Sequence, residues 1–297
     1  MLRANPIRSG ARRKMRIPFT KVQALRNDFV LVDGRAVPVA DPPALSRALC
    51  DRKSGVGADT LLVLLPSDEA DVLVRIFNPD GSEGEMSGNG TRCTAAYVLA
   101  RGDEGRASAT VETVAGVSGH LLERSEGRRR FLVSRILAPR FRPADVPVLW
   151  EGDEAIDLPL DLGPGALRVS CVNIGNPQAV VLDGWDETNW KLFGPAIENH
   201  PIFPERANVD FARVVDRDNL LVRLWERGVG PVESSGTGAS GAFAAARRKG
   251  LLAAKVRVSM EGGVLELEEV EGGLLMKGWC EEVFEGMIDL RGKGGFA

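Results

Sequence analysis

Residues 72–101 read VLVRIFNPDGSEGEMSGNGTRCTAAYVLAR, and residues 220–249 read LLVRLWERGVGPVESSGTGASGAFAAARRK. The two stretches align without a gap and share the pattern E-x-S-G-[NT]-G. Each consists of an apolar run typical of a strand, a glycine-rich turn, and an alanine-rich run typical of a helix. Two copies at so long a period are not a solenoid, which needs several short repeats. We therefore expect two homologous halves that face each other.

A second repeated segment supports this division. The segment from Asn27 to Asp33 resembles the one from Asn176 to Asp183, at nearly the same offset. An asparagine-headed strand and a strand–turn–helix unit thus recur in the same order. Three prolines, Pro139, Pro143 and Pro147, lie between the first and the second copies of these segments and interrupt any regular helix or strand. The sequence predicts an N-terminal half over residues 15–138 and a C-terminal half over residues 139–278, with a last strand at about 279–297 joining the first half.

The composition argues against several classes of protein. Acidic and basic side chains are interspersed, with a formal net charge of −3, so no nucleic-acid-binding surface is expected. The four cysteines are scattered and only two histidines occur, which argues against a metal site and for a reducing, cytoplasmic location. No apolar run approaches the roughly 20 residues that cross a membrane. Residues 1–14 are basic and contain no acid, and we expect a disordered extension with Met15 as the effective start.

Short β-branched runs separated by turns dominate the rest of the chain. Helices are expected at residues 42–51, 88–100, 190–199 and 239–249. We also expect a turn at Asn27-Asp28 and two separate final strands, at 274–279 and 283–290. Because strands outnumber helices and most neighbours are joined by hairpins, the sheets should be antiparallel or mixed. The predicted fold class is α/β (α+β), with two halves that each wrap such a sheet around a central alanine-rich helix.

The two glycine-rich turns can bind an anion. A glycine-rich turn at a helix start exposes backbone N–H groups that have no partner within the helix, and the aligned peptide dipoles add positive potential there. Such a turn binds a carboxylate or phosphate, so two facing turns could hold one small anionic substrate. Each turn also carries a serine at the helix entrance, Ser87 or Ser235. A simple N-cap role accounts for these serines equally well.

Residues 236–241 also match the dinucleotide-binding pattern G-x-G-x-x-G after a strand and into a helix. Alone this pattern is weak evidence. The twin turn lacks the third glycine, and the chain lacks the regular βαβ alternation of a dinucleotide-binding fold. The phosphate-binding pattern G-K-[ST] does not occur. A nucleotide-binding function is therefore disfavoured.

Residues 75–93, RIFNPDGSEGEMSGNGTRC, closely resemble the signature of the diaminopimelate epimerase family. Residues 225–230 and 235–239 resemble the family's second signature, and the resemblance extends from about residue 15 to residue 290. It implies two pseudo-symmetric halves with the active site between them, and it makes a homodimer plausible. The implied enzyme is an isomerase without cofactor or metal that converts LL- to meso-diaminopimelate, a precursor of lysine and peptidoglycan. One residue removes the α-proton and another, on the opposite face, returns a proton.

The resemblance also assigns residues to the binding of a small amino acid. The matching positions are Asn27, Asn78, Gly88, Asn89, Asn176, Asn208, Glu226, Arg227, Gly236 and Thr237. Turn formation is the alternative role for the asparagines. Because these positions match jointly, substrate contact is the better interpretation.

The acid–base positions depart from the family pattern. The family's catalytic cysteines fall at Ser87 and Ser235, and its histidines fall at Gln23 and Gln178. An alcohol is a much weaker acid than a thiol and needs a neighbouring base. With the histidines replaced, Glu226 is the candidate base, and Glu85 and Glu233 are also near in sequence.

Three hypotheses follow from this departure. The first is an epimerase that uses the two serines, with Glu226 as a catalytic carboxylate. The second is a ligand-binding pseudoenzyme that has lost turnover, motivated by the simultaneous loss of thiols and histidines. The third is a related isomerase or lyase that uses a carboxylate base such as Glu226. Exchange of a substrate α-hydrogen with solvent separates the first hypothesis from the second.

Overall fold

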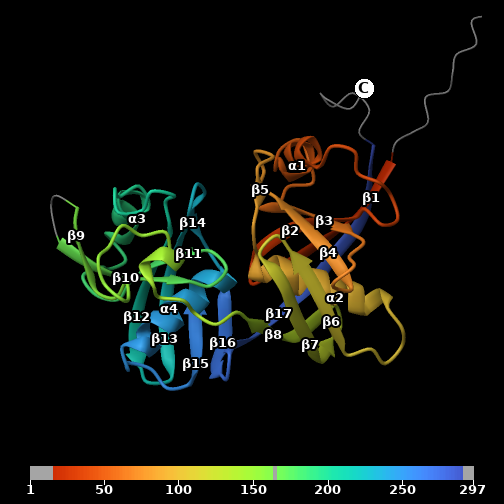
Figure 1. Ribbon diagram of the computed structural model, residues 1–297. Coiled ribbons are helices and arrows are strands. Elements are labelled where there is room, and N and C mark those ends of the chain that lie inside the picture. The colour runs from red at the N-terminus through yellow and green to blue at the C-terminus, as the bar shows by residue number, and fades with distance from the viewer. Residues whose placement is uncertain (1–15, 163–165, 290–297) are drawn as a thin grey trace, which may run out of the picture.

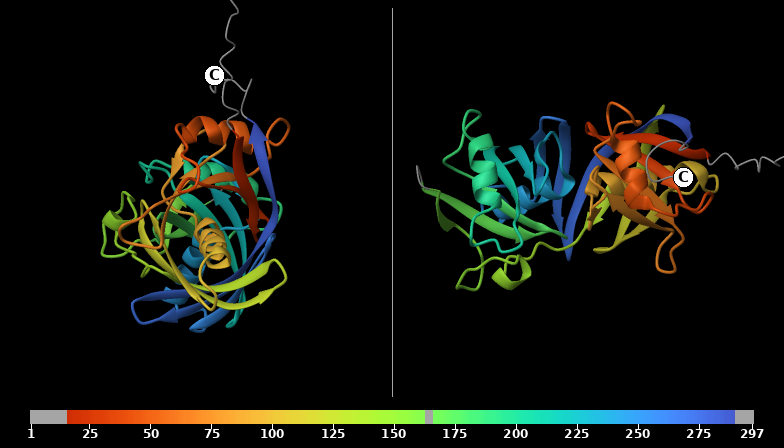
Figure 2. Two further views of the ribbon diagram at one scale, coloured as in Figure 1. Left: turned by 90° about the vertical axis from the view of Figure 1, so that its right-hand side faces the viewer. Right: turned by 90° about the horizontal axis from the view of Figure 1, so that it is seen from above.

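The computed structural model describes residues 16–162 and 166–289, so the predicted extension at residues 1–14 lies outside the described residues. Two lobes lie side by side (Figures 1 and 2). The N-terminal lobe carries helices α1 (Pro42–Cys50) and α2 (Gly88–Arg101). The C-terminal lobe carries α3 (Trp190–Glu198) and α4 (Gly236–Arg248), and a short 3₁₀ turn, η1 (Pro143–Asp145), lies in the segment that precedes its sheet.

The strands of the N-terminal lobe surround α2. They are β1 (Arg16–Ala24), β2 (Asn27–Asp33), β3 (Thr60–Leu65), β4 (Val72–Phe77), β5 (Glu83–Gly84), β6 (Ser108–Thr113), β7 (Gly116–Glu126) and β8 (Arg129–Ile136). Pairing runs from β17 (Gly273–Asp289) through β1, β2, β3, β4, β6, β7 and β8 and back to β17. The sheet therefore closes around α2, whose residues from Gly88 to Leu99 are all buried. Small alanine and glycine side chains allow this close packing on every side.

The C-terminal lobe packs its strands against α4. These strands are β9 (Leu158–Asp161), β10 (Ala166–Asn173), β11 (Pro177–Val181), β12 (Asn208–Asp216), β13 (Asn219–Glu226), β14 (Gly230–Val232), β15 (Lys255–Met260) and β16 (Gly263–Val270). Pairing runs in the order β9, β10, β11, β12, β13, β15, β16 and β17. The pairs β11–β12 and β13–β15 are parallel, as β2–β3 and β4–β6 are in the other lobe.

One strand joins the two lobes, which corrects the expectation of two final strands. The single strand β17 pairs with β16 and β8 in its first part and with β1 in its second part. At Glu281 the pairing passes directly from Arg129 of β8 to Gln23 of β1. Pairing with β1 continues past this point with only a register shift opposite Lys21 and Val22, so the chain needs no turn. Figure 2 shows this strand crossing between the lobes.

The turn between β1 and β2 lies at Leu25-Arg26, and the expected turn at Asn27-Asp28 is wrong. Asn27 and Asp28 pair with Ala24 and Gln23 in the ladder. Leu25 and Arg26 instead take left-handed backbone conformations, with φ of 53° and 69°. Leu25 is fully buried in the hydrophobic core around α4. Burial in the opposite lobe offsets the cost of a conformation that side chains other than glycine rarely adopt.

Gly262 packs against the turn at Leu25-Arg26. Replacing Gly262 tests how closely the two lobes are packed together. A Cβ atom added at Gly262 would lie 2.1 Å from the carbonyl oxygen of Leu25. We expect Gly262→Ala to lower the free energy of unfolding by about 1–3 kcal/mol, because backbone atoms must move apart. Gly119→Ala is the control, since that added Cβ would meet nothing within 4 Å. Equal denaturant midpoints for the two variants would contradict this close contact.

Candidate active site

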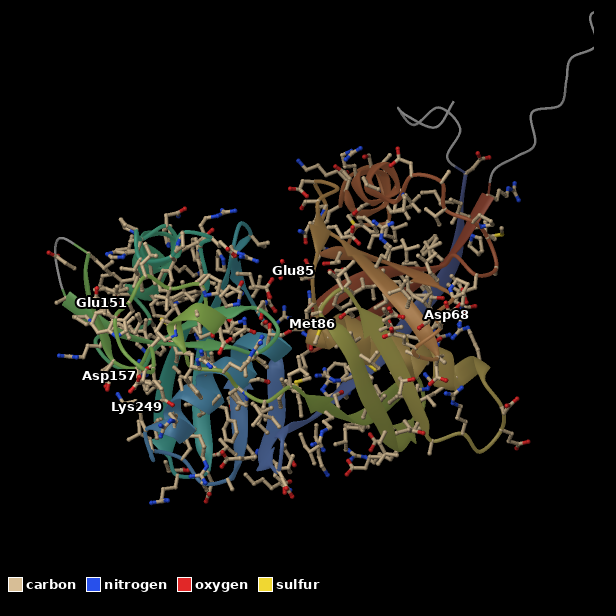
Figure 3. All side chains as sticks on the ribbon, in the orientation of Figure 1. Asp68, Glu85, Met86, Glu151, Asp157 and Lys249 are labelled. Carbon is tan, nitrogen blue, oxygen red and sulfur yellow. The ribbon has the colours of Figure 1, made fainter. Side chains whose placement is uncertain are left out.

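A cleft of about 1030 Å³ lies where the two lobes meet. Every residue that the sequence predicts for the site lines it: Asn27, Asn78, Ser87, Gly88, Asn89, Asn176, Asn208, Glu226, Arg227, Ser235, Gly236 and Thr237. Figure 3 shows Glu85 and Met86, which also line the cleft, at the edge of the N-terminal lobe that faces the C-terminal lobe. The structure thus brings together residues that lie up to 210 positions apart in the chain.

The entrances of α2 and α4 touch at the base of this cleft. A Cβ atom added at Gly88 would lie 3.4 Å from the Cα atom of Gly236, and one added at Gly236 would lie 3.4 Å from the Cα atom of Gly88. Two helix N-termini that meet in this way bring positive potential together. Their first N–H groups have no partner within the helix. An anion at this point would therefore be stabilised by both helices.

Both serines cap these helices. Ser87 and Ser235 have extended backbones, and their hydroxyl oxygens accept hydrogen bonds from the amides of Gly90 (3.0 Å) and Gly238 (3.2 Å). The N-cap role is thus present in the structure. It leaves each hydroxyl group a proton to donate toward another acceptor.

Glu226 lies beside Ser235. It ends β13 and is partly buried at the wall of the cleft. Burial raises the pKa of Glu226 to about 7, although the neighbouring Ser235 hydroxyl lowers it, and Asp59 adds a smaller upward contribution. A carboxyl group that titrates near neutral pH can both accept and return a proton.

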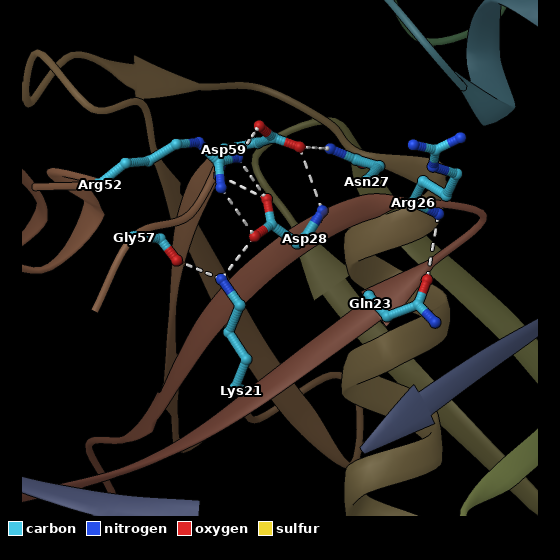
Figure 4. Close-up of polar contacts among 8 residues, drawn as sticks. All are labelled: Lys21, Gln23, Arg26, Asn27, Asp28, Arg52, Gly57 and Asp59. Atoms are coloured by element: carbon cyan, nitrogen blue, oxygen red, sulfur yellow. Dashed lines mark hydrogen bonds and ion pairs between the residues drawn. The ribbon is translucent and has the colours of Figure 1, made fainter. Parts of the chain in front are cut away.

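Glutamines occupy the two positions where the family resemblance implies histidines. The Gln178 amide donates to Asn176 Oδ1 at 2.7 Å, and the Gln23 amide donates to Glu281 Oε2 at 2.9 Å. Figure 4 shows that Gln23 also accepts a hydrogen bond from the backbone of Arg26. An amide does not titrate in the range where proteins fold. The two faces of the cleft therefore differ in their capacity for proton transfer.

Asn27 is held by a network of charged side chains (Figure 4). Its amide donates to Asp59 Oδ2 at 2.9 Å, and Arg52 bridges Asp59 (2.6 Å) and Asp28 (2.7 Å). Lys21 contacts Asp28 at 2.5 Å. Burial alone would raise the pKa of Asp28, but the bonds from Arg52 and Lys21 outweigh it and lower the pKa to about 2. The network thus stays charged, and it fixes which way the Asn27 amide points.

The C-terminal wall is held by hydrogen bonds to backbone groups. Asn208 donates to the carbonyl of Pro177 at 3.0 Å and accepts from the amide of Arg227 at 2.9 Å. Behind them, the buried Glu198 of α3 accepts from the Trp225 indole at 2.7 Å and from the amide of Gly228 at 2.9 Å. These bonds fix both sides of the Glu226-Arg227 pair.

Among the residues described, no group of three or more histidine, cysteine, aspartate or glutamate side chains is arranged to hold a metal ion. Within the same part of the chain, no helix is long and apolar enough to cross a membrane.

Known proteins resemble this chain in sequence and in architecture. The family model described as diaminopimelate epimerase matches residues 19–127 and 170–280. The chain belongs to the diaminopimelate epimerase family. A diaminopimelate epimerase of Desulforudis audaxviator is 42% identical over 273 residues, which cover 90% of this chain and 98% of that protein. One of Pelotomaculum thermopropionicum is 42% identical over 277 residues, covering 92% and 99%.

Solved structures of more distant proteins resemble this family member in fold. A probable proline racemase from Agrobacterium radiobacter has a TM-score of 0.70 at 17% identity and covers 94% of each chain. A hydroxyproline epimerase from Agrobacterium vitis has a TM-score of 0.65 at 18% identity, covering 92% of this chain and 91% of that one. The fold is a mixed α/β fold with two sheet regions and few helices.

Several residues that shape the site were missed in the sequence. They are Asp59, Arg92, Glu198, Asp210 and Ser234. Asp59 directly precedes β3, which lies parallel to β2 with Thr60 opposite Phe29. Recognition of that parallel pair would have placed Asp59 beside Asn27.

Asp210 is an unusual member of this group. It lies two residues after Asn208 on β12, and a Cβ atom added at Gly238 would lie 2.5 Å from its Oδ1 atom. Burial and the nearby Glu226 raise the pKa of Asp210 well above its usual range. The raised pKa favours the uncharged form of this carboxyl group, which lies beside the first turn of α4.

The titration of Glu226 gives a testable pH dependence. If its carboxylate accepts the Ser235 proton, the enzyme is inactive while Glu226 is protonated. The rate should therefore rise with pH and level off above about 7. Glu226→Gln should remove this rise and lower kcat by about 10²–10⁴-fold, the usual contribution of a general base. Glu85→Gln, which changes an exposed acid of the same cleft, should keep the rise. An unchanged pH profile in Glu226→Gln would contradict this role.

Proposed function

We propose that this chain is a diaminopimelate epimerase in which Ser87 and Ser235 take the two acid–base positions. The observation that carries the proposal is the contact between the two helix entrances, each of which starts with a capping serine at the same cleft. The chain's 42% identity to diaminopimelate epimerases over nearly their whole length supports the choice of substrate. The product would serve the synthesis of lysine and peptidoglycan.

The proposed reaction inverts the α-carbon by two proton transfers. The substrate α-carboxylate binds the free N–H groups of residues 88–89 and 236–237, which stabilise the negative charge that develops there. In one direction, the Ser235 oxygen takes the α-proton while its own proton passes to the Glu226 carboxylate. The Ser87 hydroxyl then gives its proton to the opposite face of the carbanion. Ser87 regains a proton from water and Glu226 releases one, so the enzyme returns to its starting state. No cofactor or metal is needed.

The remaining polar residues of the cleft suit the rest of the substrate. Diaminopimelate carries two ammonium and two carboxylate groups, and the cleft offers carboxylates, guanidinium groups and amides. We assign the substrate's amino and distal groups to Glu226 and Arg227 and to the asparagines Asn27, Asn78, Asn176 and Asn208. Hydrogen bonds to neighbouring groups, such as the one from Asn78 to Ser82 Oγ at 2.9 Å, limit the ways in which these amides can turn.

We extend the proposal to the organisation of the protein. The same order of antiparallel and parallel pairs surrounds α2 and α4, which supports two pseudo-symmetric halves, at residues 15–138 and 139–278, each wrapped around one helix. Family membership supports a homodimer and a cytoplasmic location. The division into halves, the homodimer and the location all remain predictions.

A second candidate function uses the carboxylate directly. The raised pKa of Glu226 favours this alternative, because a base that titrates near neutral pH can take a proton from carbon without a serine. A related isomerisation or elimination would then need Glu226 but neither hydroxyl group. A ligand-binding protein without turnover would need neither Glu226 nor the hydroxyl groups of Ser87 and Ser235 for proton transfer.

Deuterium exchange separates these functions. The protein is incubated with LL-diaminopimelate in D₂O, and α-deuterium and the meso isomer are followed by mass spectrometry and NMR. An epimerase incorporates deuterium and forms the meso isomer. Ligand-induced thermal stabilisation without either signal would support a binding protein and contradict the proposed function.

Asparagine and cysteine substitutions test the serines themselves. Asparagine caps helices as well as serine does but cannot carry the α-proton, so Ser87→Asn and Ser235→Asn should keep stability within about 0.5 kcal/mol. Each should lower epimerisation about 10²-fold or more, the lower limit for acid–base catalysis. Ser87→Cys should raise kcat, because a thiol is more acidic than an alcohol and a helix N-terminus favours the thiolate. Full epimerase activity in either asparagine variant would show that its hydroxyl group does not transfer the proton.

A further inference from the structure

The side chain of Asn89 connects the two lobes. Asn89 lies in the first turn of α2 and is 2% exposed. Its Nδ2 atom is 3.3 Å from Asn27 Oδ1 and 3.2 Å from Ser234 Oγ. Asn27 begins β2 in the N-terminal lobe, and Ser234 directly precedes Ser235 in the C-terminal lobe. One amide group thus binds both sides of the cleft.

Arg92 fixes the direction of this amide. Arg92 is fully buried, and its Nη1 atom donates to Asn89 Oδ1 at 3.0 Å, while Nη2 lies 3.2 Å from the sulfur of Met276. A guanidinium group only donates. If the Asn89 amide were flipped, two donors would face each other, so Oδ1 must point to Arg92 and Nδ2 must point to the cleft.

The partners of Asn89 are themselves fixed. Because the Asn27 amide nitrogen donates to Asp59, its oxygen is left to accept from Asn89. On the other side, the carbonyl of Glu233 accepts from the amide of Gly262 at 2.7 Å, and its carboxylate pairs with Arg26 at 2.8 Å. The segment that leads to Ser235 is therefore held against the β1–β2 turn, and the bond from Asn89 to Ser234 completes this attachment.

We propose that Asn89, oriented by Arg92, is a positioning residue that sets the separation of Ser87 and Ser235 through its bond to Ser234. The inference rests on the proposed epimerase function. Acid–base catalysis across two faces requires both groups at fixed distances from the α-carbon, and a displacement of about 1 Å can cost roughly 10²-fold in rate. A loss of this bond should therefore affect kcat more than KM.

A double-mutant cycle tests the bond. Asn89→Leu keeps about the size of the side chain but removes the amide, so it can form no hydrogen bond with Ser234. A carboxylate at this position would not serve, because it could accept the proton of the Ser234 hydroxyl. Ser234→Ala removes the acceptor without changing charge, together with the longer bond (3.5 Å) from Ser234 to the carbonyl of Ala24. We expect Ser234→Ala to lower kcat about five- to tenfold with little change in KM, in line with a small displacement. In the Asn89→Leu background, Ser234→Ala should have little further effect, because residues in direct contact are not additive.

The control is Ser134→Ala, which removes a buried hydroxyl group that contacts the His120 ring at 2.8 Å, away from the cleft. This control should keep the parental kcat. Additive effects of Asn89→Leu and Ser234→Ala would overturn the inference, as would a kcat in Ser234→Ala equal to that of Ser134→Ala. The second comparison decides the question if Asn89→Leu does not fold. An inactive parental protein would instead contradict the proposed function.

Discussion

The contact between Gly88 and Gly236 is the constraint on which the rest of the structure depends. It brings two positive helix ends together, and a Cβ atom added at either glycine would lie 3.4 Å from the Cα atom of the other. The surrounding sheets, the shared strand β17 and the turn at Leu25-Arg26 all hold the two helices in this position. An anion bound between the helix ends would relieve their repulsion, so the fold itself favours a carboxylate substrate.

The capacity for proton transfer then depends on the side chains beside the serine at each helix entrance. Ser235 has Glu226 beside it, a carboxyl group whose pKa of about 7 suits proton transfer. Ser87 has a backbone amide of its own helix as its observed partner, and the family's histidine positions hold Gln23 and Gln178, which point to Glu281 and Asn176. The two faces are therefore chemically unequal. Under the proposed mechanism, serines at the positions where the family resemblance implies cysteines would rely more heavily on the helix dipoles and on one carboxylate.

Much of the fold and the site could be predicted because the repeat is explicit. The ranges of α1, α2 and α3 agree with the sequence prediction to within one residue at each end. The residues assigned from the family resemblance line one cleft, while their roles there stay predictions. The turn at Leu25-Arg26 was missed because its left-handed backbone is supported by burial in the other lobe, which local propensity does not reveal. Asp59 and Ser234 were missed for a similar reason, since their partners are Asn27 and Asn89 across parallel strands and across the lobes.

The most direct test of an anion site between the two helix entrances is a crystal structure with LL-diaminopimelate bound to the Ser235→Asn variant. We expect the α-carboxylate to accept hydrogen bonds from the backbone amides at both helix entrances. The α-carbon would then lie between Ser87 and residue 235, with Glu226 behind the latter. A carboxylate bound elsewhere in the cleft, or an α-carbon with both positions on the same face, would contradict the central claim.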